Sequence, residues 1–297
     1  MADFKQKRHG GKPTGHRQEP QSQARGGKVR AARPAAKPAP AMPAQLPDDV
    51  LVGRNAVTEA LRAGRGINRV LLAQGDHAGS IPEIEALAHA QGVPVQYVER
   101  SKIEAIAAGT RHQGVLAYVA PVAYVELEDI LQAAAAKGEP PFLLLLDELE
   151  DPHNLGALLR TADATGVHGV LIPKRRSVPL TATVAKTSAG AVEYVPVARI
   201  GNIAQTLKEL KQKGFWVAGA DMDGSQQYWE ADLTGPLVLV VGSEGHGMSR
   251  LTKENCDFIV KMPMVGRINS LNASVAGSIL MYESLRQRLL QVQAAQR

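Results

Sequence analysis

Cysteine is nearly absent from this 297-residue chain, and aromatic residues are scarce. The single cysteine, Cys256, excludes a disulfide framework and a zinc site built on several cysteines. Aromatic residues make up 4% of the chain and hydrophobic residues 44%, which predicts a globular protein with an aliphatic core. Because disulfides belong to oxidising compartments, we expect this protein to work in the reducing cytoplasm.

Long hydrophobic runs and metal-binding spacings are also missing. The longest apolar stretch, residues 140–146, is far shorter than the roughly 20 residues of a membrane-spanning helix. No apolar signal segment opens the chain, and the eight histidines show no HExxH or related spacing. We therefore expect no membrane segment, no secretory signal and no metal.

Positive charge is concentrated at the N-terminal end. Residues 1–46 contain ten Lys and Arg but only two acidic residues, a net charge of +8, whereas the rest of the chain carries −3. The segment is rich in Pro, Gly and Gln and poor in large apolar residues, a composition that predicts disorder. We interpret residues 1–49 as a disordered basic tail, which either contacts nucleic-acid phosphates or only keeps the protein in solution.

Two α/β regions are expected after the tail. Residues 50–121 predict a small α/β domain, and residues 122–140 predict a linker. The patterns in the small domain indicate helices at residues 57–61 and 84–88 and strands at residues 70–73, 93–98 and 115–119.

Residues 141–297 alternate strands and helices more clearly, which predicts a parallel sheet flanked by helices. Near-continuously apolar strands indicate burial on both faces. Ligands of such sheets bind beyond the carboxyl ends of the strands, so we expect functional loops after residues 146, 172, 241 and 261. The expected strands are residues 142–147, 168–172, 192–197, 215–220, 237–241 and 258–262, and the expected helices are about residues 154–165, 179–189, 202–213 and 272–290.

Two of these loops carry unusual sequences. Residues 151–162 open a helix and include Asn154 and Arg160, although Asp151 and Pro152 are also ordinary helix-start residues. Residues 241–247 contain three glycines, which allow a sharp turn and close approach to a ligand. This loop is neither a dinucleotide fingerprint nor a P-loop, and its Glu244 suits a hydroxyl, an amine or a cation better than a phosphate.

A third segment precedes the C-terminal helix. Ser270 and Asn272 stand where this helix is expected to begin, so helix capping is one explanation for both. The helix itself carries an apolar stripe at spacings of three and four, which indicates either core packing or a dimer face. The stripe consists of Val275, Ile279, Tyr282, Leu285 and Leu289.

Together, in this order and at these spacings, the three segments closely resemble the motifs of the SpoU (TrmH) family of RNA 2′-O-ribose methyltransferases. The resemblance covers residues 142–290 and extends into residues 51–120, which are similar to the family's N-terminal domain of ribosomal protein L30e type. Members with this architecture are similar to the enzyme that methylates a guanosine ribose in 23S rRNA. The matching positions are Asn154, Gly156 and Arg160 in the first motif, Gly242, Glu244, Gly245 and Gly247 in the second, and Pro263, Met264, Ser270, Leu271, Asn272, Ser274 and Ala276 in the third.

The resemblance implies S-adenosylmethionine as methyl donor, a homodimer, and a SPOUT-like α/β domain whose parallel sheet carries a deep trefoil knot. It implies adenosine contacts from Gly242, Met262 and Leu271. It also implies catalytic roles for Arg160, Glu244, Asn154, Ser270 and Asn272.

Arg160 is the residue that the resemblance implies as activator of the ribose 2′-hydroxyl. Because a guanidinium is effectively always protonated, two roles stay open. Arg160 either loses a proton with help from the adjacent RNA phosphate, or clamps that phosphate and stabilises the developing alkoxide. Glu244 is expected to position Arg160 or the target ribose.

The protein must also bind its RNA substrate, and two basic clusters are expected to contact the RNA phosphates. One lies in the small domain and the other follows the second strand of the large domain, and a solvated charged face is the alternative for the first. They consist of Arg54, Arg62, Arg65 and Arg69, and of Lys174, Arg175 and Arg176.

Three other functions compete with this expectation. A tRNA ribose methyltransferase of the same family fits the motifs, although the L30e-like domain favours rRNA. A non-catalytic RNA-binding relative is the second alternative, and the intact Asn154, Arg160, Glu244 and Asn272 argue against it. A nucleotide-dependent oxidoreductase lacks the early glycine fingerprint that it would need.

Overall fold

The computed structural model describes residues 46–295, so the basic tail expected at residues 1–49 lies almost wholly outside the described residues. The described chain forms a four-stranded sheet from its N-terminal part and a seven-stranded sheet from its C-terminal part. No helix in residues 46–295 combines the length and apolarity that crossing a bilayer requires.

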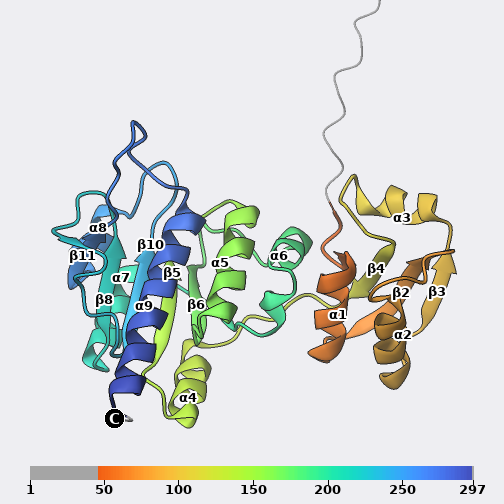
Figure 1. Cartoon of the computed structure of the whole chain (residues 1–297), viewed down its shortest axis with the longest axis horizontal. Helices are drawn as coiled ribbons and strands as arrows, with labels where there is room; N and C mark the ends of the chain where they lie inside the picture. Colours follow the sequence, from red (N-terminus) through yellow and green to blue (C-terminus); the bar gives the residue numbers. More distant parts are fainter. Residues whose placement is uncertain (1–45, 296–297) are drawn as a thin grey trace, which may run out of the picture. The chain divides into compact units, whose positions relative to one another are not determined.

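The N-terminal sheet has the strand order β1-β4-β2-β3 (Figure 1). Successive side chains of a strand point to opposite faces, so β2 contributes Leu72 to one core and Leu71 to another. Helices α1 and α2 pack on the first face and α3 on the second. The elements are β1 (Val50–Val52), α1 (Arg54–Arg62), β2 (Ile67–Ala73), α2 (Ile81–Ala90), β3 (Val95–Val98), α3 (Arg100–Ala107) and β4 (Val115–Val119).

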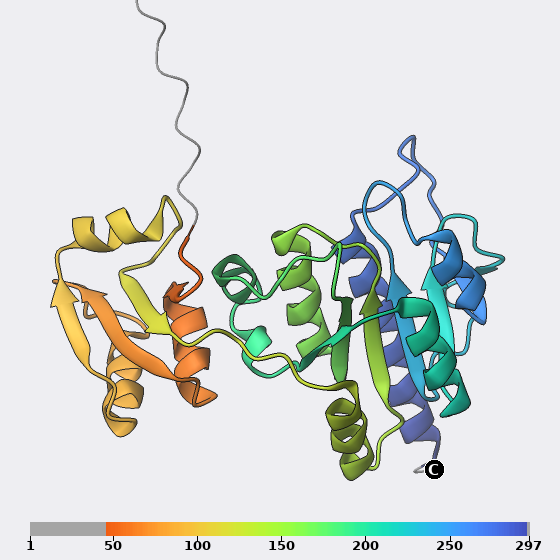
Figure 2. The same ribbon diagram turned by 180° about the vertical axis from the view of Figure 1, so that it is seen from behind.

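The C-terminal sheet has the order β7-β6-β5-β10-β8-β11-β9, and every pair of neighbouring strands is parallel, as expected (Figures 1 and 2). Its central strands β5 and β10 are buried along their whole length. The strands are β5 (Phe142–Leu146), β6 (Gly169–Pro173), β7 (Val197–Ile200), β8 (Trp216–Ala220), β9 (Gln226–Gln227), β10 (Leu237–Val241) and β11 (Phe258–Lys261).

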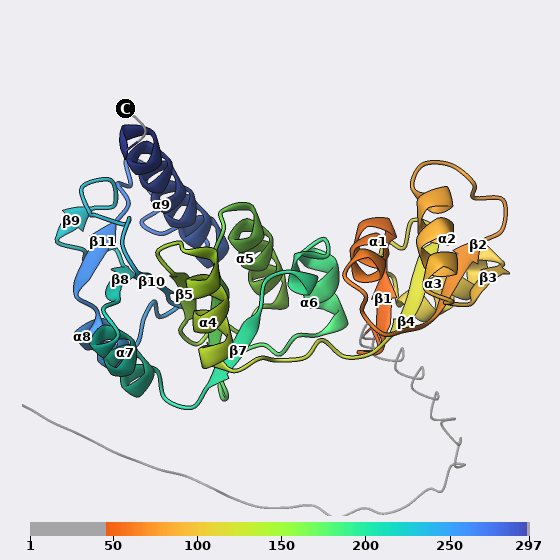
Figure 3. The ribbon, with the colours of Figure 1, turned by 90° about the horizontal axis from the view of Figure 1, so that it is seen from below.

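Helices cover both faces of this sheet (Figure 3). On one face, Leu158 of α5 and Leu280 of α9 share a core with Leu144. On the other, Ile130 of α4 and Leu207 of α7 share a core with Leu145. The helices are α4 (Leu127–Lys137), α5 (Pro152–Ala164), α6 (Ala182–Thr187), α7 (Ile203–Gln212), α8 (Arg250–Asn255) and α9 (Ala273–Ala295).

Two expectations about local structure need changing. The strand expected at residues 192–197 is wrong, because Ala191–Glu193 forms a 3-10 helix, η1, and the strand begins at Val197. Hydrogen bonds within the local turns satisfy the backbone N–H groups of this segment, and Pro196 has no N–H with which to join a sheet. The segment expected as a linker, residues 122–140, contains helix α4, whose Ile130 is buried.

Two glycines let α5 pack closely on its neighbours, Gly156 at the contact with α6 and Gly277 at the contact with α9. A Cβ at Gly156 of α5 would overlap the Thr187 side chain of α6, and a Cβ at Gly277 of α9 would lie 2.6 Å from Leu158 of α5. Only glycine permits such close helix packing. The beginnings of α5 and α9 consequently lie within hydrogen-bonding reach of each other.

Candidate functional site

The second and third motifs line one cavity of about 420 Å³ at the carboxyl ends of β8, β10 and β11. This is the edge at which parallel sheets bind their ligands. Two of the four loops expected from the sequence contribute, namely those after β10 and β11. The lining residues are Ala220, Asp221, Met222, Asp223, Val241, Gly242, Ser243, Glu244, Gly245, His246, Gly247, Lys253, Met262, Met264, Asn269, Ser270, Leu271, Ala273 and Ala276.

The glycine-rich loop folds back on itself. Ser243 and Gly247 exchange two backbone hydrogen bonds, at 3.1 and 3.0 Å. Gly247 adopts a φ of +64°, a conformation that favours glycine. A Cβ on Gly242 would overlap the backbone of Gly247, whereas Gly245 has no atom within 4 Å of such a Cβ. Gly242 is therefore required by the shape of the loop itself.

A hydrogen-bond chain joins all three motifs. Asn272 donates from Nδ2 to Oδ1 of Asn154 at 3.0 Å, and Asn154 donates from its own Nδ2 to Oε1 of Glu244. Asn154 is buried, whereas Glu244 is exposed at the cavity. The chain fixes one carboxylate oxygen of Glu244 and leaves the other available to a ligand.

Helix capping explains one of these residues but not the other. Asp151 is the residue that caps α5, accepting from the backbone N–H of His153 at 3.0 Å, so Asn154 has no capping role. Asn272 does cap the start of α9, because its Oδ1 accepts from the backbone N–H groups of Ser274 and Val275. Its Nδ2 is still free to reach Asn154. Asn272 therefore performs both tasks that the sequence left open.

The remaining predicted site residues divide into two groups. Gly242, Met262, Leu271 and Ser270 all line the cavity. Arg160 does not line it: the residue is exposed on α5, and no hydrogen bond or ion pair engages its guanidinium within residues 46–295. The structure therefore leaves Arg160 free at the surface of the helix that carries Asn154.

Asp221 lines the cavity but is absent from the sequence-based predictions. It directly follows β8, its side chain is 8% exposed, and one carboxylate oxygen lies 2.6 Å from the Lys253 ammonium. Its place just beyond a strand end is the feature of the sequence that points to it.

The basic cluster expected in the small domain is largely engaged in internal contacts. The expectation is wrong for Arg65, whose side chain is 9% exposed and pairs with Glu193 at 2.7 Å. Arg62 pairs with Glu59 and Glu83, and Arg69 lies 4.3 Å from the centre of the Tyr118 ring. In the second cluster, Lys174 and Arg175 are exposed, and Arg176 pairs with Glu148 at 2.8 Å.

Comparisons with known proteins match both parts of the chain. Residues 141–282 match the model of the SpoU rRNA methylase family, and residues 50–125 match the model of an RNA 2′-O ribose methyltransferase substrate-binding domain. A Bacillus subtilis protein, YacO, whose name places it among TrmH family tRNA/rRNA methyltransferases, is 51% identical over 240 residues. The match spans 81% of this chain and 96% of that protein.

Solved structures agree with the sequence comparisons. An AdoMet-bound rRNA methyltransferase from Sinorhizobium meliloti is 25% identical with a TM-score of 0.65, over 80% of this chain and 86% of its own. An RNA 2′-O ribose methyltransferase is 28% identical with a TM-score of 0.66, over 81% and 88%. The resemblance seen in the motifs is confirmed, and the chain belongs to the SpoU (TrmH) family of RNA methyltransferases.

Proposed function

We propose that this protein transfers the methyl group of S-adenosylmethionine to the 2′-hydroxyl of a guanosine ribose in 23S rRNA. The observation that carries the proposal is the meeting of the glycine-rich loop with the Asn272–Asn154–Glu244 hydrogen-bond chain at one cavity. The Sinorhizobium relative, an rRNA methyltransferase bound to AdoMet, supports both the cofactor and the RNA class.

The lining of the cavity fits this cofactor. Apolar groups of Val241, Met262 and Leu271 suit the faces of an adenine, and the carboxylates of Asp221 and Glu244 suit a ligand that carries a sulfonium and an ammonium. When bound, S-adenosylmethionine supplies an activated methyl group. In this proposal Gly242, Met262 and Leu271 hold the adenosine.

The proposed roles of the remaining residues follow from their charges and contacts. Arg160, exposed and cationic, clamps the RNA phosphate next to the target ribose and stabilises the negative charge that develops on the 2′-oxygen as the hydroxyl proton passes to water. Glu244 orients the ribose through its unengaged oxygen. Asn154 and Asn272 hold Glu244 in place, and Ser270 donates a hydrogen bond to the ribose.

The proposal includes a homodimer. Three residues of the apolar stripe expected on the C-terminal helix are about half exposed on α9. They are Val275, Tyr282 and Leu289. The face of α9 that packs on the sheet is a different one, which carries Leu280 and Met281. An apolar helix face left open in one chain supports its burial against a second copy.

The proposal also includes the deep trefoil knot and a cytoplasmic location. After β11, near one edge of the sheet, the chain returns to α9, which packs on the central strand β10 and on α5. This return past the loops that line the cavity supports a threaded chain, an arrangement that is exceptional among protein folds.

Mapping of ribose methylation tests the proposed substrate. RNA from cells that lack this gene is compared with RNA from cells that carry it, by sequencing sensitive to 2′-O-methylation. We expect one methylated guanosine to disappear from 23S rRNA and to return when the gene is restored. Loss of a tRNA methylation would support the alternative substrate, and an unchanged set of methylations would overturn the enzymatic proposal.

Substitution of Arg160 tests the proposed chemistry. Arg160→Lys keeps the positive charge but loses the two-pronged guanidinium geometry. We expect slower methylation of RNA with an unchanged affinity for S-adenosylmethionine, measured by calorimetry. Near-native turnover of this variant would contradict both roles considered for Arg160.

A further inference from the structure

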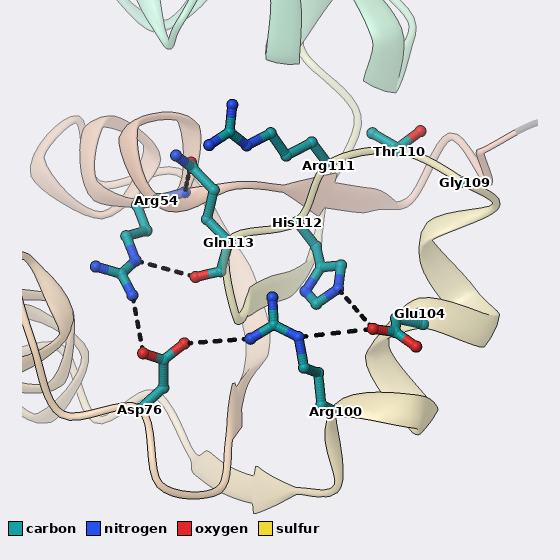
Figure 4. Close-up of a pocket in the computed structure, with 9 residues that line it drawn as sticks. All are labelled: Arg54, Asp76, Arg100, Glu104, Gly109, Thr110, Arg111, His112 and Gln113. Carbon is teal, nitrogen blue, oxygen red and sulfur yellow. Dashed lines mark hydrogen bonds and ion pairs between the residues drawn. The ribbon is translucent and has the colours of Figure 1, made fainter.

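A second cavity, of about 570 Å³, lies entirely in the N-terminal part and is not explained by the methyl-transfer site (Figure 4). It is bounded by the loop after β2, by helix α3 and by the loop of residues 108–114 that leads into β4. Its lining is strongly polar and contains three arginines. The lining residues are Arg54, Asp76, Arg100, Glu104, Gly109, Thr110, Arg111, His112 and Gln113.

One wall of this cavity is a continuous chain of charged and polar groups (Figure 4). Asp76 lies 3.1 Å from Arg54 and 3.8 Å from Arg100, and Glu104 lies 3.6 Å from Arg100 and 3.9 Å from the ring of His112. The Arg54 guanidinium also donates to the backbone carbonyls of Ala78 and Gln113, at 2.9 and 3.0 Å. Arg54 is thus a fixed part of the wall, whereas Arg100 is 59% exposed and only loosely paired.

The opposite wall is a loop held in a strained conformation. Ala108 and Gln113 have φ values of +49° and +53°, which non-glycine residues rarely adopt. A Cβ on Gly114 would overlap the Asp76 carboxylate. The ring of His112, 7% exposed, accepts at Nδ1 from the backbone N–H of Gly114 at 3.1 Å. Backbone strain of this kind persists where surrounding contacts enforce it, and it is common at binding sites.

Unpaired positive charge gathers beside this loop. Arg111 extends away from the charged wall, and no acidic group pairs with it among residues 46–295 (Figure 4). Lys186 of α6 lies close enough for its pKa to be lowered by burial and then by the charge of Arg111. Burial, followed by the charges of Arg100 and then Lys186, also keeps the pKa of His112 below its usual value. The acids in the lining pair with Arg54 and Arg100, and no acid of the part of the chain that the structure describes forms an ion pair with Arg111 or Lys186.

We propose that this cavity binds one nucleotide of the RNA substrate, with its phosphate on Arg111 and its base inside the cavity. The proposal rests on RNA being the substrate, as proposed above, and it assigns the contact to particular residues. The volume exceeds what one phosphate needs, and the side chains of Thr110 and Gln113 offer polar groups to a base or ribose edge. A guanidinium without a partner suits a phosphodiester, which it can bind through two hydrogen bonds.

Charge removal is the first test, made on the full-length protein. Arg111→Gln is compared with Lys102→Gln, since Lys102 is an exposed cation of α3 that does not line the cavity. Filter binding with a labelled 23S rRNA transcript at several salt concentrations is the measurement. We expect Arg111→Gln to weaken binding about tenfold and to reduce the salt slope by about one. Lys102→Gln should stay within about twofold of the unaltered protein.

Filling the cavity without altering charge is the second test. Thr110→Trp should lower kcat/KM for RNA by about tenfold, while the affinity for S-adenosylmethionine and the melting temperature stay unchanged. If Arg111→Gln binds like Lys102→Gln, or if Thr110→Trp methylates RNA normally, no nucleotide enters the cavity and the inference is overturned. Should the unaltered protein neither bind nor methylate RNA, the proposed function fails as well, so the two failures are distinguishable.

Discussion

Asn272 and Asn154 are 118 residues apart in the chain, yet the side chain of one donates to the side chain of the other at 3.0 Å. The same Asn272 accepts from two backbone N–H groups at the start of α9. The position of Glu244 at the cavity is therefore tied, through Asn154, to the beginning of a helix that packs on α5. This relationship gives the first prediction.

Asn154→Ala removes the middle of the hydrogen-bond chain and leaves Glu244 without its donor. A hydrogen bond to a charged group contributes about 1.5–3 kcal/mol, so we expect turnover to fall by about 10- to 100-fold. Affinity for S-adenosylmethionine should change by less than about twofold. Single-turnover methylation and calorimetry measure the two effects separately, and His153→Ala, at the exposed neighbour, is the control. An equal loss in both quantities would assign Asn154 to cofactor binding.

Gly242→Ala and Gly245→Ala form a matched pair within one loop. The added Cβ at position 242 would overlap the backbone of Gly247, whereas the one at position 245 meets nothing within 4 Å. We expect the first variant to lose at least about tenfold in affinity for S-adenosylmethionine and the second to keep most of it, as measured by calorimetry. Equal effects of the two substitutions would show that the loop rearranges freely.

The Arg65–Glu193 ion pair joins the loop between α1 and β2 to η1, and both side chains are less than one-tenth exposed. Glu193→Gln leaves the guanidinium buried without its counter-charge, which typically costs about 3–5 kcal/mol of unfolding free energy. Urea denaturation should show this loss in Glu193→Gln and a much smaller one in the double variant Arg65→Met with Glu193→Leu. If the double variant were as unstable as the single one, the loss of unfolding free energy would come from altered packing and not from the unpaired charge.

His168 should make the fold sensitive to mild acid. Its ring is buried, and Nδ1 accepts from the backbone N–H of Phe142 at 3.1 Å. Burial, and then the charge of Lys137, lower the folded-state pKa of His168 below its usual 6.5. The unfolded chain therefore takes up a proton first as the pH falls below about 6.5, and unfolding becomes easier from there downward.

A variant isolates this contribution from that of other histidines. Asn at position 168 offers an oxygen acceptor to the Phe142 N–H but does not titrate. Between pH 7 and pH 5, the unfolding free energy measured by urea denaturation should fall more steeply for the unaltered protein than for His168→Asn. Parallel pH profiles would contradict the assignment.

The sequence predicts the parts of the fold that depend on local pattern. Apolar runs such as Leu237–Val241 identify the central strands, and the rule about strand ends leads to the glycine-rich loop beside them. The short strand expected at residues 192–197 fails because the turn bonds around Gly190 and the missing N–H of Pro196 outweigh a β-branched composition. Strand order and the edge strand β9, of two residues, leave no periodic trace in the sequence.

Long-range pairing is the other limit of sequence reasoning. The sequence presents Arg65 as one of several clustered cations, and nothing in its spacing indicates that Glu193, 128 residues later, neutralises it. Conversely, nothing in the sequence distinguishes Arg111, whose guanidinium has no acidic partner among the described residues, from the neighbouring arginines that do have one. The motifs therefore indicate the cavity proposed for methyl transfer, whereas only the structure distinguishes arginines paired with acids from arginines without an acidic partner in residues 46–295.

The cavity proposed to hold the cofactor has a consequence for how the protein is made. Met262, Leu271 and Ala276, which form one side of this cavity, all follow β11 in the sequence. The N-terminal domain and most of the parallel sheet precede them in synthesis, so these parts can fold before any cofactor can be held. A nascent polypeptide that ends before these residues therefore lacks one side of the cavity, even when the part that matches the substrate-binding domain is complete.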